Sequence, residues 1–179
     1  MTVMVALLRG VNVGGKGSLA MADLRAIATE LGYDAVATYI QSGNLVLATG
    51  GSGAKVSKEL AAAIAASSSV QPAVVVRTRS QLAKVVAGNP FLERGEDPDK
   101  VHVVFMDGSA KAALAKVDLP KYEPDEAIPV GSELHLFLPN GVGRSKLAAD
   151  LGRQKGAVGT QRSWRTVTKL LEMADEAAG

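Results

Sequence analysis

The feature that most constrains the fold is a short break at Ser42-Gly43 between two β-rich runs, at 36–40 and 45–47. Strands joined by so few residues pair as an antiparallel hairpin, because neighbouring parallel strands need a crossover of about a dozen residues or more. One β-rich run, at 2–8, precedes this hairpin, and another follows at 73–78. The pattern therefore favours an antiparallel sheet over the main alternative, a doubly wound parallel sheet.

Helical patterns fill the two gaps between these runs. Leu24, Ile27, Ala28 and Leu31 have the spacing of one helix face, and Gly32 is expected to end that helix. A second helix is predicted at 56–66, which is rich in Ala, Leu and Lys. The first 78 residues thus have the order β-α-β-β-α-β, which is the ferredoxin-like order.

The second half of the chain is less regular. Its predicted elements are a helix at 80–88, strands at 100–106 and 133–138, and helices at 110–117, 145–151 and 164–178. The stretch 120–129 holds three prolines and several acids and is expected to be irregular. We therefore predict an α+β protein: a ferredoxin-like βαββαβ half at 1–79, a connecting helix at 80–89, and a smaller βαβ-type half at 90–179 that is closed by C-terminal helices.

Composition excludes several classes of protein. Cysteine is absent from the 179 residues, which excludes disulfides, thiolate metal sites and cysteine nucleophiles. Twenty basic against 18 acidic residues give a net charge of +2, too balanced for a histone-like polyanion binder. No apolar run approaches the roughly 20 residues of a membrane-spanning helix, and the N-terminus does not resemble a signal peptide. We therefore expect a cytoplasmic protein without membrane association.

The charge is unevenly distributed along the chain. The segment 144–169 holds seven basic residues and one acid, a formal charge of +6, so the rest of the chain carries −4. A basic stretch of this kind attracts phosphate-bearing partners, nucleic acid included. A solvated helix face is the alternative interpretation.

A glycine-rich loop follows the first predicted strand. Its residues 10–16 fit G-x-x-x-x-G-K, the pattern of a phosphate-binding loop. The next residue is Gly17 instead of the Ser or Thr that binds magnesium, and a hairpin topology does not suit a nucleotide-hydrolysing P-loop domain. Two interpretations stay open: a connector whose glycines permit turns, or an anion-binding nest of backbone N–H groups assisted by Lys16.

Two further segments have polar groups suited to a ligand. In the loop 141–146, Ser145 is expected to cap the following helix, whose N-terminal amides attract anions, and Arg144 and Lys146 flank it. At the hairpin tip, Gln41, Ser42 and Asn44 can donate and accept hydrogen bonds. Ordinary capping and turn chemistry are the alternatives for both segments.

The remaining candidates concern chemistry. Trp164 has the spacing of a core residue, which leaves Arg162 and Arg165 as the expected ligand contacts near it. His102 and His135 lie in predicted strands without metal-ligand spacing, so both are interpreted as structural, and we predict no metal and no cofactor. Three carboxylates are possible general bases, but none has a supporting motif: Asp23, Glu93 and Asp107.

Five motifs occur in an order that resembles a known family. They are residues 7–16 (LLRGVNVGGK), 39–44 (YIQSGN), 89–91 (NPF), 143–146 (GRSK) and 162–167 (RSWRTV). This series is similar to the bacterial family of domain of unknown function 1697. Ser163 and Gly17 stand where that family usually or often has Asn. The resemblance implies a compact α/β protein of two small ferredoxin-like parts and implies no established activity.

Together these features predict one groove that binds a phosphate-bearing ligand: a nucleotide, a phosphorylated metabolite or a nucleic-acid backbone. The predicted site residues are Arg9, Asn12, Gly14, Gly15, Lys16, Gln41, Ser42, Asn44, Gly143, Arg144, Ser145, Lys146, Arg162 and Arg165. Two alternatives remain, an enzyme acting on a phosphorylated small molecule and a non-catalytic structural or oligomer-forming protein. The sequence decides neither the oligomeric state nor whether a reaction is catalysed.

Overall fold

The chain folds into two compact units. The computed structural model describes residues 1–14, 17–154 and 159–179. The first unit comprises Met1–Ala83 and Lys169–Gly179, and the second comprises Lys84–Thr168. Residues 169–179, which the sequence pattern assigned to the second half, therefore cluster with the first unit. Two helices, α3 (Arg79–Ala87) and α7 (Trp164–Ala178), contain residues of both units.

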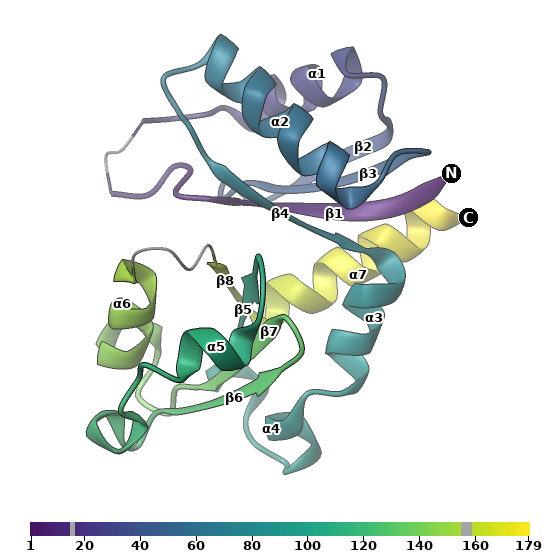
Figure 1. Ribbon diagram of the computed structural model, residues 1–179. Helices are drawn as coiled ribbons and strands as arrows, with labels where there is room; N and C mark the ends of the chain where they lie inside the picture. The colour runs from purple at the N-terminus through teal and green to yellow at the C-terminus, as the bar shows by residue number, and fades with distance from the viewer. Residues whose placement is uncertain (15–16, 155–158) are drawn as a thin grey trace. The chain divides into compact units, whose positions relative to one another are not determined.

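The first unit has the predicted ferredoxin-like order. Its strands are β1 (Thr2–Arg9), β2 (Asp34–Tyr39), β3 (Asn44–Thr49) and β4 (Ala73–Thr78). They form an antiparallel sheet in the order β2-β3-β1-β4, and α1 (Met21–Glu30) and α2 (Gly53–Ser67) lie on one face of it (Figure 1). The α+β class and the hairpin between β2 and β3 are thus confirmed.

Strand alternation builds the core of this unit. Met4, Ala6 and Leu8 of β1 pack in one cluster with Leu60 of α2 and other residues of both helices. Each large apolar side chain buried in this way contributes about 1.5–3 kcal/mol relative to its exposed state. Residues on the opposite face of the sheet are buried as well, among them Val5, Leu7, Val46 and Val75. The buried strands of this sheet therefore have nearly continuous apolar sequences, without the alternation of an amphipathic strand.

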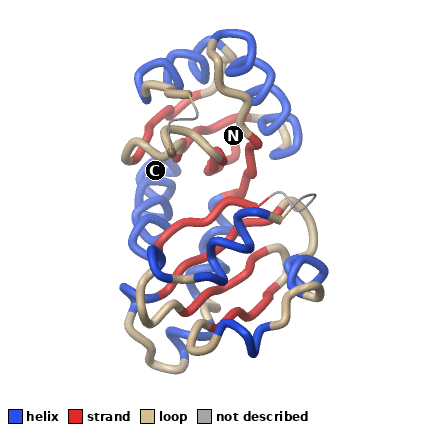
Figure 2. Tube along the Cα trace, turned by 90° about the vertical axis from the view of Figure 1, so that its left-hand side faces the viewer, coloured by secondary structure: helices blue, strands red, loops and turns tan. Residues whose placement is uncertain are grey.

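The second unit repeats the same topology. Its elements are β5 (Val101–Met106), α5 (Ala110–Leu114), β6 (Glu126–Val130), β7 (Glu133–Phe137), α6 (Lys146–Arg153) and β8 (Gly159–Ser163). The strands form an antiparallel sheet in the order β6-β7-β5-β8 (Figure 2). Both units are therefore βαββαβ, and the second has two more strands, β6 and β8, than the sequence pattern predicted.

The two unpredicted strands, β6 and β8, are both edge strands. β6 contains Pro129, which a sheet tolerates at its edge because one side of an edge strand needs no hydrogen-bond donors. β8 has the sequence GTQRS and carries no apolar side chain that would reveal its alternation. The segment 120–129, expected to be irregular, in fact ends in β6, and residues 159–163 form a strand before the final helix begins at Trp164.

The two faces of the second sheet have different surroundings. Val104, Met106, Leu134 and Leu136 pack in one cluster that includes Leu147 of α6. The opposite face buries both apolar and polar side chains. The apolar ones include Val101, Val103 and Phe105, and the polar ones are His135, Thr160 and Arg162. Because successive residues of a strand point to opposite faces, His102 shares the face of Val104 and α6, whereas Arg162 does not.

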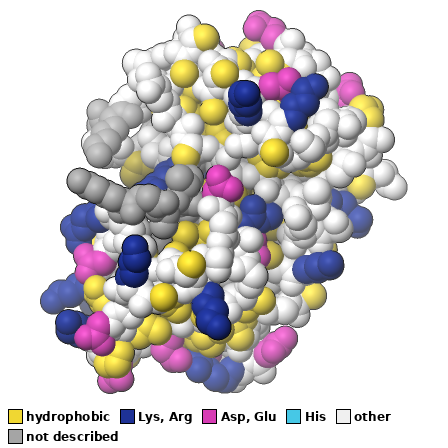
Figure 3. Space-filling model, viewed as in Figure 1, with side chains coloured by type: hydrophobic (Ala, Val, Ile, Leu, Met, Phe, Trp, Pro, Cys, Tyr) yellow, Lys and Arg dark blue, Asp and Glu magenta, His cyan; other side chains and the backbone are white. Residues whose placement is uncertain are grey.

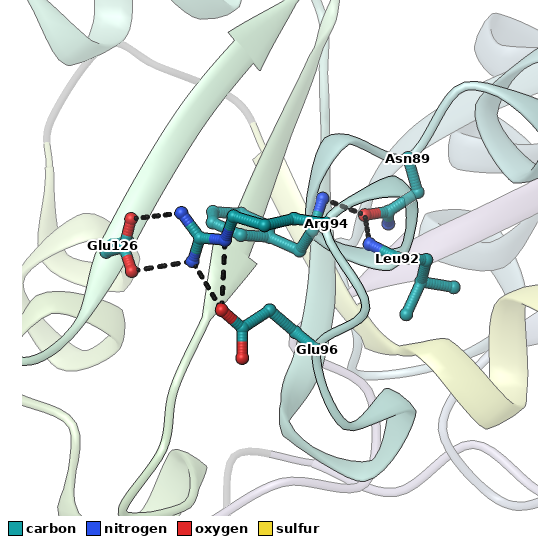
Figure 4. Close-up of polar contacts among 6 residues, drawn as sticks. Asn89, Leu92, Arg94, Glu96 and Glu126 are labelled. Atoms are coloured by element: carbon teal, nitrogen blue, oxygen red, sulfur yellow. Dashed lines mark hydrogen bonds and ion pairs between the residues drawn. The ribbon is translucent and has the colours of Figure 1, made fainter.

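Short helices connect these elements: α4 (Pro90–Glu93), η1 (Pro98–Lys100), η2 (Leu119–Tyr122) and η3 (Val142–Arg144). At α4, the Asn89 side chain accepts hydrogen bonds from the backbone N–H groups of Phe91 (3.0 Å) and Leu92 (3.4 Å), and so caps the helix (Figure 4). The Asn89-Pro90-Phe91 motif therefore has a local structural role.

The residue after α4 links this helix to the edge of the sheet. The Arg94 guanidinium donates to both carboxylate oxygens of Glu126, at 3.0 and 2.8 Å, and to Glu96 at 2.9 Å (Figure 4). It also lies over the Phe91 ring, 5.1 Å from the ring centroid, and over Phe137 at 5.9 Å. A planar, two-pronged contact combined with ring stacking is one that only arginine makes, and it ties α4 to β6.

Candidate functional site

The first glycine-rich loop is anchored to the hairpin tip by one side chain. The Asn12 amide nitrogen donates to the carbonyl of Gln41 (2.7 Å) and to that of Leu19 (2.8 Å), and its oxygen accepts from the Leu19 N–H (2.9 Å). Asn12 has φ +56°, a left-handed conformation that asparagine tolerates better than most residues. The structure thus brings the loop and the hairpin tip together, through hydrogen bonds internal to the protein.

The hairpin tip itself is held by Asn44, which is fully buried. Its amide nitrogen donates to the Tyr39 carbonyl (3.1 Å) and to the Ser42 hydroxyl (2.9 Å). Gly43 has φ +76°, and a Cβ at this position would lie 2.7 Å from that of Leu8, so the turn requires glycine. The polar atoms predicted to orient a ligand here therefore form the turn.

The other predicted residues of the first unit are placed as follows. The side chain of Gln41 is exposed, Arg9 is half-buried at the end of β1, and Gly14 is exposed with φ +60°. Gly15 and Lys16, which were expected to complete an anion-binding nest, lie outside the described residues. What the structure describes of this loop is thus a structural connection to the hairpin.

The second predicted loop opens onto a cavity of about 460 Å³ in the second unit. One wall is the sheet and the other is the start of α6. The cavity is lined by His102, Val142, Gly143, Ser145, Ala148, Ala149, Gln161 and Ser163. Two of the predicted residues, Gly143 and Ser145, are among them, and the volume falls in the range of small-molecule sites, about 300–1,000 Å³.

The N-terminal end of α6 borders this cavity. The Ser145 hydroxyl accepts from the Ala148 N–H (2.9 Å) and caps the helix, as predicted from the sequence. The first N–H groups of any helix have no partner within it, and this places partial positive charge at the end of the helix that lines the cavity. An anion is the ligand that such a helix end favours.

His102 lines the opposite wall of the cavity. Its side chain is 7% exposed, and its Nδ1 has no hydrogen-bond partner among the described residues. Burial lowers the pKa of His102, and a hydrogen bond to the Lys100 backbone only partly opposes that effect. The ring is therefore neutral near pH 7.

The predicted cations have different positions around this unit. Arg144 and Lys146 are exposed on either side of Ser145, and Arg165 is exposed on α7. Arg162 is buried on the face of the sheet opposite His102, where it donates to the Thr160 hydroxyl and to the Gln161 carbonyl, and burial lowers its pKa to about 10. The structure thus places Arg162 away from the cavity that Gly143 and Ser145 line.

The described residues of the basic segment 144–169 do not form a continuous free patch. Arg153 pairs with Asp150, Lys169 pairs with Glu172, and Arg162 is buried. Figure 3 shows Lys and Arg side chains interspersed with Asp and Glu over the face that it presents. No helix of the described chain has the length and apolar character needed to cross a membrane.

Acid–base and metal chemistry find little support at the cavity. Its lining contains no carboxylate among the described residues, and Asp23, Glu93 and Asp107 are exposed elsewhere. The described part of the chain also holds no group of three or more His, Asp or Glu residues able to bind a metal ion. The arrangement is suited to holding a ligand by hydrogen bonds and charge.

Three polar residues of this cavity were not predicted as site residues: His102, Gln161 and Ser163. His102 was interpreted as structural because it has no metal-ligand spacing, and the other two lie in β8, which was not predicted. The pairing of β5 with β8, in which His102 lies opposite Ser163, is what assembles them. Had the strand been recognised, its alternation would have placed Gln161 and Ser163 on one face.

Comparison with known proteins identifies the family but no activity. A search of the curated proteins finds no match. A solved structure, that of the conserved bacterial protein SP0830 from Streptococcus pneumoniae, is similar with a TM-score of 0.75 and 21% sequence identity, and the alignment covers 97% of this chain and 98% of that one. The likeness shows that the two proteins share a fold. The family model described as protein of unknown function (DUF1697) matches residues 1–135, about three quarters of the chain, and the protein therefore belongs to this family.

Proposed function

We propose that this protein binds a phosphate-bearing small molecule, with the phosphate group at the first turn of α6. One observation carries the proposal: the N-terminal end of α6 and the buried His102 line the same cavity of about 460 Å³. The partial positive charge at this helix end is suited to an anion, and the exposed cations Arg144 and Lys146 flank it. Anion binding and a cytoplasmic location are both part of this proposal.

The cavity supports a small ligand better than a polymer. Nucleic-acid binding draws on many cations along a surface, whereas three of the basic residues in 144–169 are paired or buried. Catalysis on a phosphorylated molecule would require a general base or a metal, and His102 is the one candidate base in the described lining, with no carboxylate beside it to orient it. Binding is therefore the function that this geometry supports best.

A charge-reversal pair at Ala149 tests the proposal. Ala149 is exposed and lines the cavity from α6, so a longer side chain there can reach the bound anion without removing any polar group. We expect Ala149→Glu to weaken the binding of phosphorylated compounds at least about tenfold more than Ala149→Gln, because the two side chains differ only in charge. Ligands come from a thermal-shift screen of nucleotides and sugar phosphates, and calorimetry gives the dissociation constants.

Three results would contradict the proposal. One is a screen in which no phosphorylated compound raises the melting temperature at low salt. Another is equal loss of affinity in the Glu and Gln variants, which would mean that the site does not recognise charge. Affinity for single-stranded or duplex oligonucleotides that greatly exceeds the affinity for mononucleotides would favour the polymer alternative.

A further inference from the structure

A second cavity, of about 530 Å³, lies in the first unit, where the start of β1 and the end of α7 are side by side (Figure 1). We call it the α7 cavity, and the cavity described above the α6 cavity. Val3 of β1 and Ala48 of β3 form its buried floor, and Ala177 and Ala178 of α7 line it from the helix. Its volume is in the range of small-molecule sites, about 300–1,000 Å³.

One end of the α7 cavity carries negative charge. Asp34 lines it from the start of β2 and lies opposite Ala48, so the two side chains share one face of the sheet. Asp34 is exposed, and its carboxylate forms no ion pair or hydrogen bond among the described residues. The last turn of α7 adds partial negative charge from its free carbonyl groups, and no basic residue lies in that turn. These groups are suited to an ammonium ion.

The other end carries a guanidinium group. Arg79, the first residue of α3, lines the cavity together with the hydroxyl side chains of Thr78 and Ser80. Its Nε donates to a carboxylate oxygen of Asp175, which holds the side chain beside α7. The N–H groups of its terminal nitrogens make no hydrogen bond among the described residues. They are therefore available to a carboxylate, for which guanidinium is a strong partner.

Strand pairing separates the two charged ends. Asp34 pairs with Ala48, and Ala48 pairs with Val3 of β1. Arg79 directly follows the last paired residue of β4, which places it next to Val3 in the same row across the sheet. Three strand spacings then separate the backbones of Asp34 and Arg79, about 14 Å in all. The two side chains do not neutralise each other, so a ligand can lie between them.

We propose that the α7 cavity binds a small zwitterion, a free amino acid or a dipeptide, with its ammonium group at Asp34 and its carboxylate at Arg79. A ligand of a single charge satisfies one end and leaves the other without a partner, whereas a zwitterion satisfies both. The two cavities share no lining residue among those described and belong to different units, so this site is independent of the proposed phosphate site.

The probes for the test are alanine, alanyl-alanine and two derivatives of this dipeptide that each lack one charge. N-acetyl-alanyl-alanine has no ammonium group, and alanyl-alanine amide has no carboxylate. We expect calorimetry to detect binding of alanine or alanyl-alanine. We expect each derivative to bind at least about tenfold more weakly than alanyl-alanine, because it loses a hydrogen bond between charged groups.

Three variants assign the ends of the site. Asp34→Asn keeps the shape of the side chain and removes its charge; it should weaken alanyl-alanine at least about tenfold and weaken the N-acetyl derivative no further. Asp175→Asn removes the protein partner of Arg79 but keeps the guanidinium, so it should bind the dipeptide at least as well as the unaltered protein. Asp99→Asn, an exposed carboxylate of the second unit, is the control and should change nothing.

Several results would overturn the proposal. Absence of binding for both alanine and alanyl-alanine removes the site. Equal affinities for alanyl-alanine and its amide would show that the cavity accepts any amine, and that Arg79 does not bind a carboxylate there. An equal loss of affinity for the dipeptide and for its N-acetyl derivative in Asp34→Asn would give Asp34 a purely structural role. If a variant fails to fold, the two derivatives still test both ends in the unaltered protein.

Discussion

Polar side chains in the interior of this protein differ in whether their hydrogen bonds are complete. Asn44 and Ser145 use their polar atoms to form a turn and a helix cap. In contrast, Asn89 Nδ2, His102 Nδ1 and His135 Nδ1 are buried without a partner in the described chain. Of these three residues, His102 is the one that lines the cavity beside α6.

His135 should make the stability of the protein depend on pH. Burial lowers its pKa to about 4, whereas in the unfolded chain it is about 6.5. Between these values the unfolded state binds more protons, so stability is complete above pH 6.5 and decreases as the pH falls toward 4. We expect the free energy of unfolding to lose about 2 kcal/mol between pH 7 and pH 5 through this residue.

The substitution His135→Phe checks this expectation, because it keeps a ring of similar size and removes the titration. In urea unfolding, the loss of stability from pH 7 to pH 5 should be smaller in the variant by about 2 kcal/mol. The surface substitution Lys58→Ala, on an exposed face of α2, is the control and should keep the dependence of the unaltered protein. Identical losses in the unaltered protein and in His135→Phe would show that His135 is protonated to the same extent in both states.

At the scale of the secondary-structure elements, the edge strand β6 is held at two places. It pairs with β7 on one side, and Glu126 at its start receives both prongs of Arg94. The carboxylate raises the pKa of Arg94, and the guanidinium in turn lowers that of Glu126, so the pair stays ionised at mildly acidic pH. An edge strand that contains Pro129 forms few ladder hydrogen bonds, which makes this contact important for its local stability.

Arg94→Lys should therefore loosen β6 although it preserves the charge. Lysine cannot make the two-pronged contact with Glu126, nor can it stack on Phe91 and Phe137. We expect hydrogen exchange at the amides of β6 to become severalfold faster, while the amides of β3, in the other unit, keep their rates. Arg153→Lys, which alters an exposed ion pair with Asp150 and no ring contact, is the matched control and should leave β6 unchanged. Unaltered exchange in Arg94→Lys would mean that pairing with β7 suffices.

The elements that the sequence revealed are those with local signals. The hairpin at Ser42-Gly43, the helix spacing of Leu24 and Ile27, and the final helix from Trp164 were all predictable from neighbouring residues. β6 and β8 were not, because each lies at a sheet edge, where proline and polar residues are tolerated. Because β8 was not predicted, one wall of the cavity was not predicted either. The helix-capping loop with Gly143 and Ser145 is a local feature, whereas the wall that includes His102 depends on pairing between strands far apart in the chain.

At the scale of the whole molecule, charge counted along the sequence is a poor guide to charge available on the surface. The segment 144–169 carries +6 by count. Folding buries Arg162 and pairs Arg153 and Lys169 with carboxylates. Three basic residues of the described part of this segment are exposed and form no salt bridge there: Arg144, Lys146 and Arg165. The cations next to the α6 cavity are therefore suited to guiding a small anion.

Each unit has its own apolar core, yet the chain crosses between the units within helices. Leu60 belongs to the core of the first unit and Leu134 to that of the second, and both are fully buried. The boundary falls inside α3 and inside α7, where Val167 and Leu170 lie on either side of it and are both buried. Unravelling a helix on one side of such a boundary breaks the N–H(i) to O=C(i−4) hydrogen bonds that span it. We therefore expect the two units to unfold in one cooperative transition.

Trp164 makes this expectation measurable, because it is the only tryptophan of the chain and lies in the second unit. Leu60→Ala removes a buried side chain from the first unit and should cost about 2–5 kcal/mol. If unfolding is cooperative, the substitution lowers the urea midpoint reported by Trp164 fluorescence as far as the midpoint reported by far-UV circular dichroism. Leu134→Ala, in the second unit, should likewise shift both probes together, and Lys58→Ala should shift neither by more than about 0.5 kcal/mol. The opposite result in Leu60→Ala would be an unchanged fluorescence midpoint together with a dichroism signal that splits into two steps. It would show that each unit folds on its own core and that the shared helices are too weak to couple the units.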